Sequence, residues 1–219
     1  AQAGVTMDTV VRNQLSAGNN VLFCPTVASG TETAVTLRKN DYTTSQLTVK
    51  MIQKAVATLK KNNVPTFNGD YVAIIHPYVA YDLQRDPEWI DAHKYAQPEN
   101  LFTGEIGKVA GVRFVESTEA KVWKDSDCPQ KSAASGSDPA TYYGVFSTLV
   151  LGKNAYGVTE VTGGGLQTIV KPLGAGEDPL NQRSTVGWKG ILTAKILLEQ
   201  NMVRIESVSA EWSGTVDAN

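Results

Sequence analysis

The residues best suited to acid–base chemistry are the two histidines and the carboxylates near them. His76 stands between an apolar run and Pro77, where its imidazole could act as a general base or bind a metal. A histidine at the end of a strand more commonly caps that end with a hydrogen bond, and we expect this role for His76. An enzyme would need His76 beside Asp82 in a pocket.

An acidic cluster follows, made of Asp82, Asp86, Glu88 and Asp91. Its spacing lacks the alternating ligands and the glycine of a calcium loop, so we interpret it as the solvated face of a helix. His93 lies on the same stretch and is predicted to be a partly buried packing residue.

The remaining motifs also favour structural roles. Residues 163–165 are three glycines without the Gly-Lys-Ser/Thr of a phosphate loop, which predicts a flexible turn. Trp188 shares a strand face with apolar neighbours and is expected to point into a core. Cys24 and Cys128 have no zinc-ligand spacing and are expected to be free thiols, although a single bridge stays possible. We therefore expect no catalysis, no cofactor and no metal.

Composition limits the class of protein. The 219 residues are 42% apolar and 19% charged, with 20 Lys+Arg against 22 Asp+Glu and a net charge of -2. These values predict a folded, soluble chain and argue against a protein that grips nucleic acid. No apolar stretch approaches the length of a membrane span, and residues 1–4 do not resemble a signal peptide. The chain begins with Ala1, so we expect it to be processed or cut from a longer polypeptide.

The clearest predicted element is a helix over Gln46–Lys61, with Thr43 and Gln46 forming a capping box. Lys60 and Lys61 suit its carboxyl end, and Pro65 follows. Its apolar stripe comprises Leu47, Met51, Ile52, Ala55, Val56 and Leu59.

Other elements follow from periodicity and from Pro and Gly positions. We predict helices at 6–17, 77–84 and from Asp86 to before Pro98, and strands at 21–23, 34–37, 71–75 and 109–115. In the second half, a loop at 124–141 precedes strands at 144–151, 156–161 and 166–170. After a loop at 173–183, alternation over 186–198 predicts a strand that pairs with 202–209 as a long hairpin. The predicted fold class is α+β.

Residues 71–83, YVAIIHPYVAYDL, resemble a signature of tailed-bacteriophage major capsid proteins, specifically the coat family of N-four-like phages. The resemblance spans Asp8 to Ser209. Other segments similar to that family are Trp89-Ile90, Leu101–Gly107, Gly111–Arg113, Gly187–Lys189 and Met202–Glu206.

The resemblance implies the Hong Kong 97-like (HK97-like) capsid fold, with an axial domain, a peripheral domain containing a spine helix, an E-loop and an N-terminal arm. It places residues 1–40 at the end of the spine helix and its peripheral-domain connection. Residues 41–183 would form the axial domain with an insertion at about 124–141, and residues 184–219 the long peripheral-domain hairpin and tail. Nothing corresponds to the N-terminal arm, the E-loop or most of the spine helix, so we expect a coat subunit truncated on the N-terminal side.

The implied function is a major capsid protein that self-assembles into an icosahedral shell around a phage double-stranded DNA genome. Its partners would be its own copies in hexamers and pentamers, portal, scaffold or decoration proteins, and packaged DNA in non-specific proximity, but no membrane. It would reside in the virion after assembly in the bacterial cytoplasm. We hypothesise that Glu105, Lys108 and Arg113 make charged contacts between subunits.

Three alternatives compete with this interpretation. An encapsulin-type nanocompartment shell would share the fold but enclose enzyme cargo. A β-rich ligand-binding module would fit the second half but would not explain the helix at 46–61. The third alternative is the enzyme built on His76 and Asp82.

Overall fold

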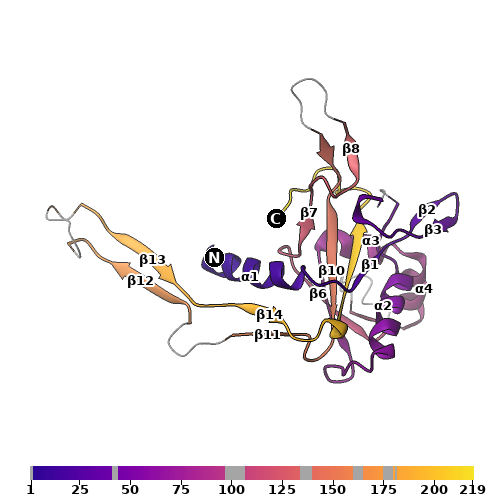
Figure 1. Ribbon diagram of the computed structural model, residues 1–219, viewed down its shortest axis with the longest axis horizontal. Helices are drawn as coiled ribbons and strands as arrows, with labels where there is room; N and C mark the ends of the chain where they lie inside the picture. Colours follow the sequence, from indigo (N-terminus) through magenta and orange to yellow (C-terminus); the bar gives the residue numbers. More distant parts are fainter. Residues whose placement is uncertain are drawn as a thin grey trace.

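A seven-stranded mixed sheet organises the chain (Figure 1). The computed structural model describes residues 2–40, 44–96, 107–133, 140–159, 165–174, 180 and 182–219, and of residues 92–96 the backbone alone. The sheet order is β1 (Val21–Phe23), β15 (Met202–Val208), β10 (Val145–Leu151), β4 (Tyr71–Ile75), β6 (Val112–Glu116) and β5 (Lys108–Val109), with β7 (Val122–Trp123) also pairing with β10. The pairs β1–β15 and β4–β6 are parallel and the others are antiparallel.

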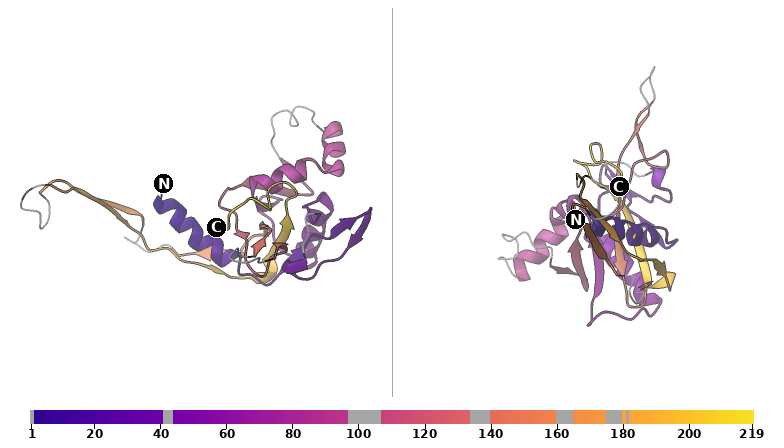
Figure 2. Two further views of the ribbon diagram at one scale, coloured as in Figure 1. Left: turned by 90° about the horizontal axis from the view of Figure 1, so that it is seen from above. Right: turned by 90° about the vertical axis from the view of Figure 1, so that its left-hand side faces the viewer.

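The two faces of the sheet bury different layers, because successive side chains of a strand point to opposite sides. Helices α2 (Val49–Lys61), α3 (Pro77–Gln84) and α4 (Pro87–Ala96) cover one face, and the main core lies between them and the sheet. Helix α1 (Gln2–Leu15) packs on the other face around a smaller cluster with Leu149. Figure 2 shows these layers from two further sides.

Helix α2 confirms the predicted stripe, since every stripe residue from Met51 onward is buried together with Leu47. The predicted capping box is wrong, because the helix begins at Val49 and Gln46 lies outside it. The N-cap residue, Thr48, makes no side-chain cap bond. Instead, the Asp86 carboxylate accepts a hydrogen bond from the Val49 amide at 2.8 Å. A residue distant in sequence thus replaces the local cap.

The predicted elements around β4 are confirmed. Strand β4, α3 and α4 occupy the expected positions, and Asp86 also accepts a hydrogen bond from the Glu88 amide at 3.0 Å as the N-cap of α4. The single strand predicted over 109–115 is instead the β5–β6 hairpin. Ala110 and Gly111 adopt φ values of 53° and 79°, which the tight turn of a hairpin requires.

The N-terminal region differs from the prediction in two places. Helix α1 begins at Gln2 rather than Thr6. The strand predicted at 34–37 is absent from the described structure, and this region forms the hairpin of β2 (Thr26–Ala28) and β3 (Thr31–Thr33) followed by the 3-10 turn η1 (Arg38–Asn40). Ser29 and Gly30, with φ values of 51° and 79°, reverse the chain there.

A long two-stranded arm leaves the body between β10 and β15 (Figure 1). Near the body β11 (Tyr156–Val158) pairs with β14 (Ala194–Ile196), and further out β12 (Gln167–Lys171) pairs with β13 (Thr185–Lys189). The predicted pairing of 186–198 with 202–209 is therefore wrong. After the 3-10 turn η2 (Glu199–Asn201), β15 pairs with β10 and β1 in the central sheet. The alternating apolar residues of 186–198 predict strands, but they do not indicate with which strands these pair.

Two further segments complete the body. The predicted loop at 124–141 contains the short hairpin of β8 (Gln130–Ser132) and β9 (Thr141–Tyr142), which projects from the body in Figure 1. Residues 209–219, which we name the C-terminal strap, run back over β10 and β7. The Gly144 amide donates to the Ser213 carbonyl at 2.6 Å, and the Val122 amide donates to the Asn219 side chain at 2.9 Å.

Candidate assembly surfaces

Two of the three predicted contact residues, Lys108 and Arg113, lie at the β5 edge of the central sheet. The Lys108 ammonium is 2.5 Å from Asp70 Oδ1, and the Arg113 guanidinium is 4.0 Å from Asp70 Oδ2. Asp70 is largely buried, whereas the Lys108 and Arg113 side chains are 58% and 69% exposed. The structure thus brings Lys108 and Arg113 together through a carboxylate that sequence reasoning missed. Glu105 lies outside the described residues.

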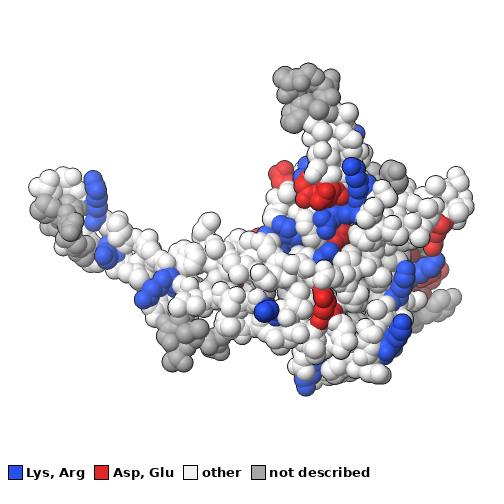
Figure 3. All heavy atoms as spheres, viewed as in Figure 1, with Lys and Arg blue, Asp and Glu red and all other residues white. Residues whose placement is uncertain are grey.

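The arm carries much of the exposed apolar surface. Every residue of β12 and β13 is exposed, including Val170 at 64%, Val186 at 73% and Trp188 at 43%. The prediction that Trp188 faces a core is wrong, because its side chain is exposed and, within the described residues, its strand pairs with β12 of the arm. Figure 3 shows the arm as mainly uncharged surface with a few Lys and Arg side chains along it.

The apolar side chains of the outer arm concentrate on one face. In the antiparallel register Val170 lies opposite Val186, and Thr168 lies opposite Trp188. Directly opposed residues point to the same side of a ribbon, so these four share one face. Apolar patches of this kind mark surfaces that bind another molecule.

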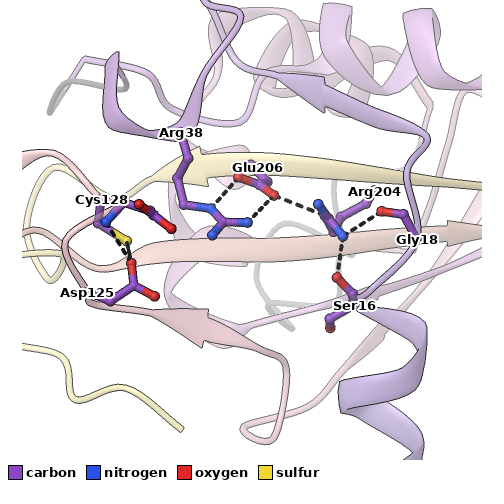
Figure 4. A network of polar contacts seen from close by, with 8 residues as sticks. Ser16, Gly18, Arg38, Asp125, Cys128, Arg204 and Glu206 are labelled. Atoms are coloured by element: carbon purple, nitrogen blue, oxygen red, sulfur yellow. Dashed lines mark hydrogen bonds and ion pairs between the residues drawn. The ribbon is translucent and has the colours of Figure 1, made fainter.

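A buried ion network lies on the α1 face of the sheet (Figure 4). The Glu206 carboxylate, fully buried on β15, accepts hydrogen bonds from Arg38 at 2.7 and 2.8 Å and from Arg204 at 3.0 Å. Trp123 lies beneath both cations, with its ring centroid 3.9 Å from the Arg38 Cζ and 5.3 Å from that of Arg204. The hydrogen bonds and charge of Glu206 raise the pKa of Arg38 despite its burial.

The same network ends helix α1. Arg204 donates hydrogen bonds to the backbone carbonyls of Ser16 and Gly18, just beyond the last helical residue, Leu15. A cation at this end interacts favourably with the unsatisfied carbonyls and with the helix dipole. Glu206 therefore connects α1, the η1 segment and the central sheet through its two arginines.

The sequence predicts that His76 caps the end of a strand with a hydrogen bond; in the structure it follows β4 and serves as the N-cap of helix α3. Its Nδ1 accepts a hydrogen bond from the Tyr78 amide at 3.2 Å, and its ring packs against Tyr78 and Phe146 with centroids 4.9 Å away. The residue is 8% exposed, and this burial lowers the pKa of the imidazole. The packed environment argues against the proposed catalytic role.

The interpretation of the acidic cluster as a solvated face is wrong for Asp82, which is 9% exposed. It lines a hollow of about 370 Å³, and His76 is not among the lining residues. Asp86 serves as the cap of two helices, as described above. Glu88 and Asp91 are exposed, as the sequence predicts, and the side chain of His93 lies outside the described residues.

Cys24 and Cys128 are both buried, and no disulfide joins them. Burial raises the pKa of the Cys128 thiol to about 12, so it is unreactive at neutral pH. Among the described residues, no group of three or more His, Cys, Asp or Glu side chains could hold a metal ion. Within the same ranges, no helix is long and apolar enough to cross a membrane.

Solved structures with the same architecture define the class of protein. The chain is similar to the capsid protein of Cyanophage P-SCSP1u, with 18% identity and a TM-score of 0.62 over 95% of this chain and 63% of that one. For the capsid of Helicobacter pylori bacteriophage KHP30 the values are 12%, 0.60, 94% and 67%. An encapsulin from Synechococcus elongatus gives 10%, 0.51, 99% and 65%. The fold is therefore HK97-like, as the sequence predicts.

The sequence assigns the family within this class. Residues 2–183 match the phage capsid protein family, and the chain belongs to that family. No curated protein matches the sequence. The chain spans just under two thirds of the cyanophage capsid chain, the first of the solved structures compared above.

Proposed function

We propose that this chain belongs to a structural protein, a major capsid protein. Copies of that protein would assemble into an icosahedral shell around a phage double-stranded DNA genome. The observation that carries the proposal is the arm. A two-stranded ribbon is marginally stable alone in water, and this one exposes Val170, Val186 and Trp188 on one face. Contact with a neighbouring subunit would bury that face.

We also propose a division into domains. We assign the body around the seven-stranded sheet to the axial domain, and α1 with the arm to the peripheral domain. The predicted unit 184–219 is then split, because β13 and β14 belong to the arm and β15 to the central sheet. The contacts of α1 with β14 support this grouping. The resemblance of residues 71–83 supports the narrower group, the coat proteins of N-four-like phages.

A variant of the arm tests the proposal. In the complete coat protein, V170S/V186S keeps the β12–β13 backbone pairing but makes the face polar. We expect the soluble subunit to form while sedimentation and negative-stain images show few or no shells. The matched control, V170I/V186I, keeps an apolar face and should assemble. Normal shells from V170S/V186S would contradict this role of the arm.

The β5 edge is proposed as a second contact between subunits, with Arg113 as its more exposed cation. Reversing the charge in R113E should weaken ring formation, although it also places a carboxylate near Asp70. R113Q removes the cation without that repulsion and is the control. Unchanged assembly of both full-length variants would remove Arg113 from the account.

The remaining features of the proposal concern location and partners. The shell would reside in the virion after assembly in the host cytoplasm and would contact portal, scaffold or decoration proteins. Packaged DNA would lie near it without specific binding, in keeping with the net charge of -2. No catalytic step is assigned to any residue. The encapsulin-type shell is the second candidate, favoured by the similarity to the Synechococcus elongatus structure, and co-purifying enzyme cargo in place of DNA would support it.

A further inference from the structure

The C-terminal strap is held on helix α3 by aromatic contacts. The Trp212 ring stacks on Tyr78, with centroids 4.6 Å apart and planes 11° apart, and meets Tyr81 edge-on at 4.9 Å. The Ser213 hydroxyl accepts a hydrogen bond from the Ser209 amide at 2.6 Å. These contacts hold the first turn of the strap over the middle of α3.

A buried carboxyl group lies under this turn. Asp82 of α3 is 9% exposed, and its Oδ2 has no hydrogen-bond partner. It lines the hollow of about 370 Å³ together with Glu211 of the strap. An ionised carboxylate with one buried oxygen left without a hydrogen bond is costly, and the carboxylate of Glu211 adds repulsion.

We propose that the strap is a pH-dependent latch, docked on α3 when Asp82 is protonated and opening more readily when Asp82 is ionised. The titratable and charged groups that line the hollow with Asp82 are Glu211 from the strap, Tyr81 and Arg85 from α3, and Asp86 from the α3–α4 junction. Asp86 is engaged by backbone amides, as described above. The lining residues that precede α2, Gln46, Leu47 and Thr48, carry no charge.

The direction of the effect follows from the proton affinity. Burial raises the pKa of Asp82 from 3.8 to about 6, and Glu211 adds to the rise, while interactions with Ser209 and Arg85 oppose it. In the open strap Asp82 meets water, so its pKa returns toward the ordinary value. The docked state therefore binds the proton more tightly than the open state. Docking of the strap is strongest below about pH 4 and becomes weaker as the pH rises from about 4 to about 6. Above that range it stays at its weaker value, because Asp82 is then ionised in both states.

Hydrogen exchange of the complete chain tests the latch. The informative amides are those of Thr215 and Val216, which both donate to the Trp212 carbonyl at 2.9 Å inside the strap. After correction for the intrinsic exchange rate, we expect the protection of these two amides to fall by at least tenfold between pH 4.5 and pH 7. The fall cannot exceed about 100-fold, because the pKa of Asp82 differs by about two between the docked and open states. Amides of β10 report global unfolding and serve as the internal reference.

Two variants separate Asp82 from other titrating groups. D82N keeps the shape but cannot ionise, so its strap protection should be flat over this range. E211Q removes the facing carboxylate and should move the midpoint of the change to lower pH while the chain stays folded. E116Q, on an exposed residue of β6, is the matched control and should behave as the original chain. A strap whose protection falls equally in D82N, or does not change with pH in the original chain, would overturn the proposal.

Discussion

Arg38 and Glu206 lie 168 positions apart in the sequence and form two hydrogen bonds of 2.7 and 2.8 Å in the interior. Glu206 is fully buried and also binds Arg204, so one carboxylate is shared by two guanidinium groups. Burial lowers the pKa of Arg204, whereas Glu206 acts to raise it. The relationship fixes the segment before α2, and through Arg204 the end of α1, on the central sheet.

Removing the charge of Glu206 should therefore destabilise the chain strongly. We expect E206Q to lower the free energy of unfolding by about 3 kcal/mol, because two buried cations lose their counter-ion. Urea denaturation followed by circular dichroism measures the change. The exposed carboxylate control, E116Q, should stay within about 0.5 kcal/mol of the original chain. An equally small change for E206Q would contradict the role of the network.

Asp86 should contribute to two helices at once. D86A removes the acceptor of the Val49 amide at the start of α2 and that of the Glu88 amide in α4. We expect a loss of about 2 kcal/mol in the free energy of unfolding, roughly one for each cap. D86N keeps one carbonyl acceptor and should lose less. If D86A and D86N are equally stable, the double-capping account is wrong.

Gly144 is required because the strap passes close to it. A Cβ atom at this position would lie 2.3 Å from Val216 Cγ1 and 3.4 Å from the Ser213 carbonyl oxygen. We expect G144A to cost about 1 to 3 kcal/mol of stability through overpacking. The double variant G144A/V216A removes the clashing methyl groups and should recover part of the loss. A double variant less stable than G144A would argue against this explanation.

His76 should titrate below the ordinary histidine value of 6.5, because burial lowers its pKa. The unfolded chain then binds a proton more readily than the folded chain, so this group destabilises the fold as pH falls through about 6.5. An NMR titration of the imidazole resonances measures the pKa, and H76N identifies the signal while keeping a helix-capping side chain. A pKa of 6.5 or above would contradict the packed environment.

Local patterns predicted the elements whose causes are local. The stripe of α2, the β-rich run of β4 and the Asp86-Pro87 start of α4 each follow from a few neighbouring residues. The arm could not be predicted in this way, because alternation at 186–198 is the same whether a strand pairs with 167–171 or with 202–208. The Ala110-Gly111 turn is not predicted either, because the apolar residues on both sides of it are also typical of one continuous strand.

The assembly surfaces were only partly predictable. The sequence indicates Lys108 and Arg113 by their charge, whereas their shared partner, Asp70, is evident from the fold, which places it beside them. The network of Glu206 had a signal in the sequence. Arg204 and Glu206 alternate on one side of an apolar strand, and such a polar pair indicates a buried ionic contact. Its second cation, Arg38, comes from a distant segment without a periodic pattern.

The most direct test of the central claim is the size and content of the native particle. Source lysate is sedimented, and the heavy fraction is imaged by negative stain and probed for the polypeptide that carries this sequence. The account predicts icosahedral particles that contain the polypeptide and protect DNA from nuclease. Particles filled with enzyme cargo would favour the encapsulin-type shell. Only a slowly sedimenting species near 23.5 kDa would contradict the proposed shell function.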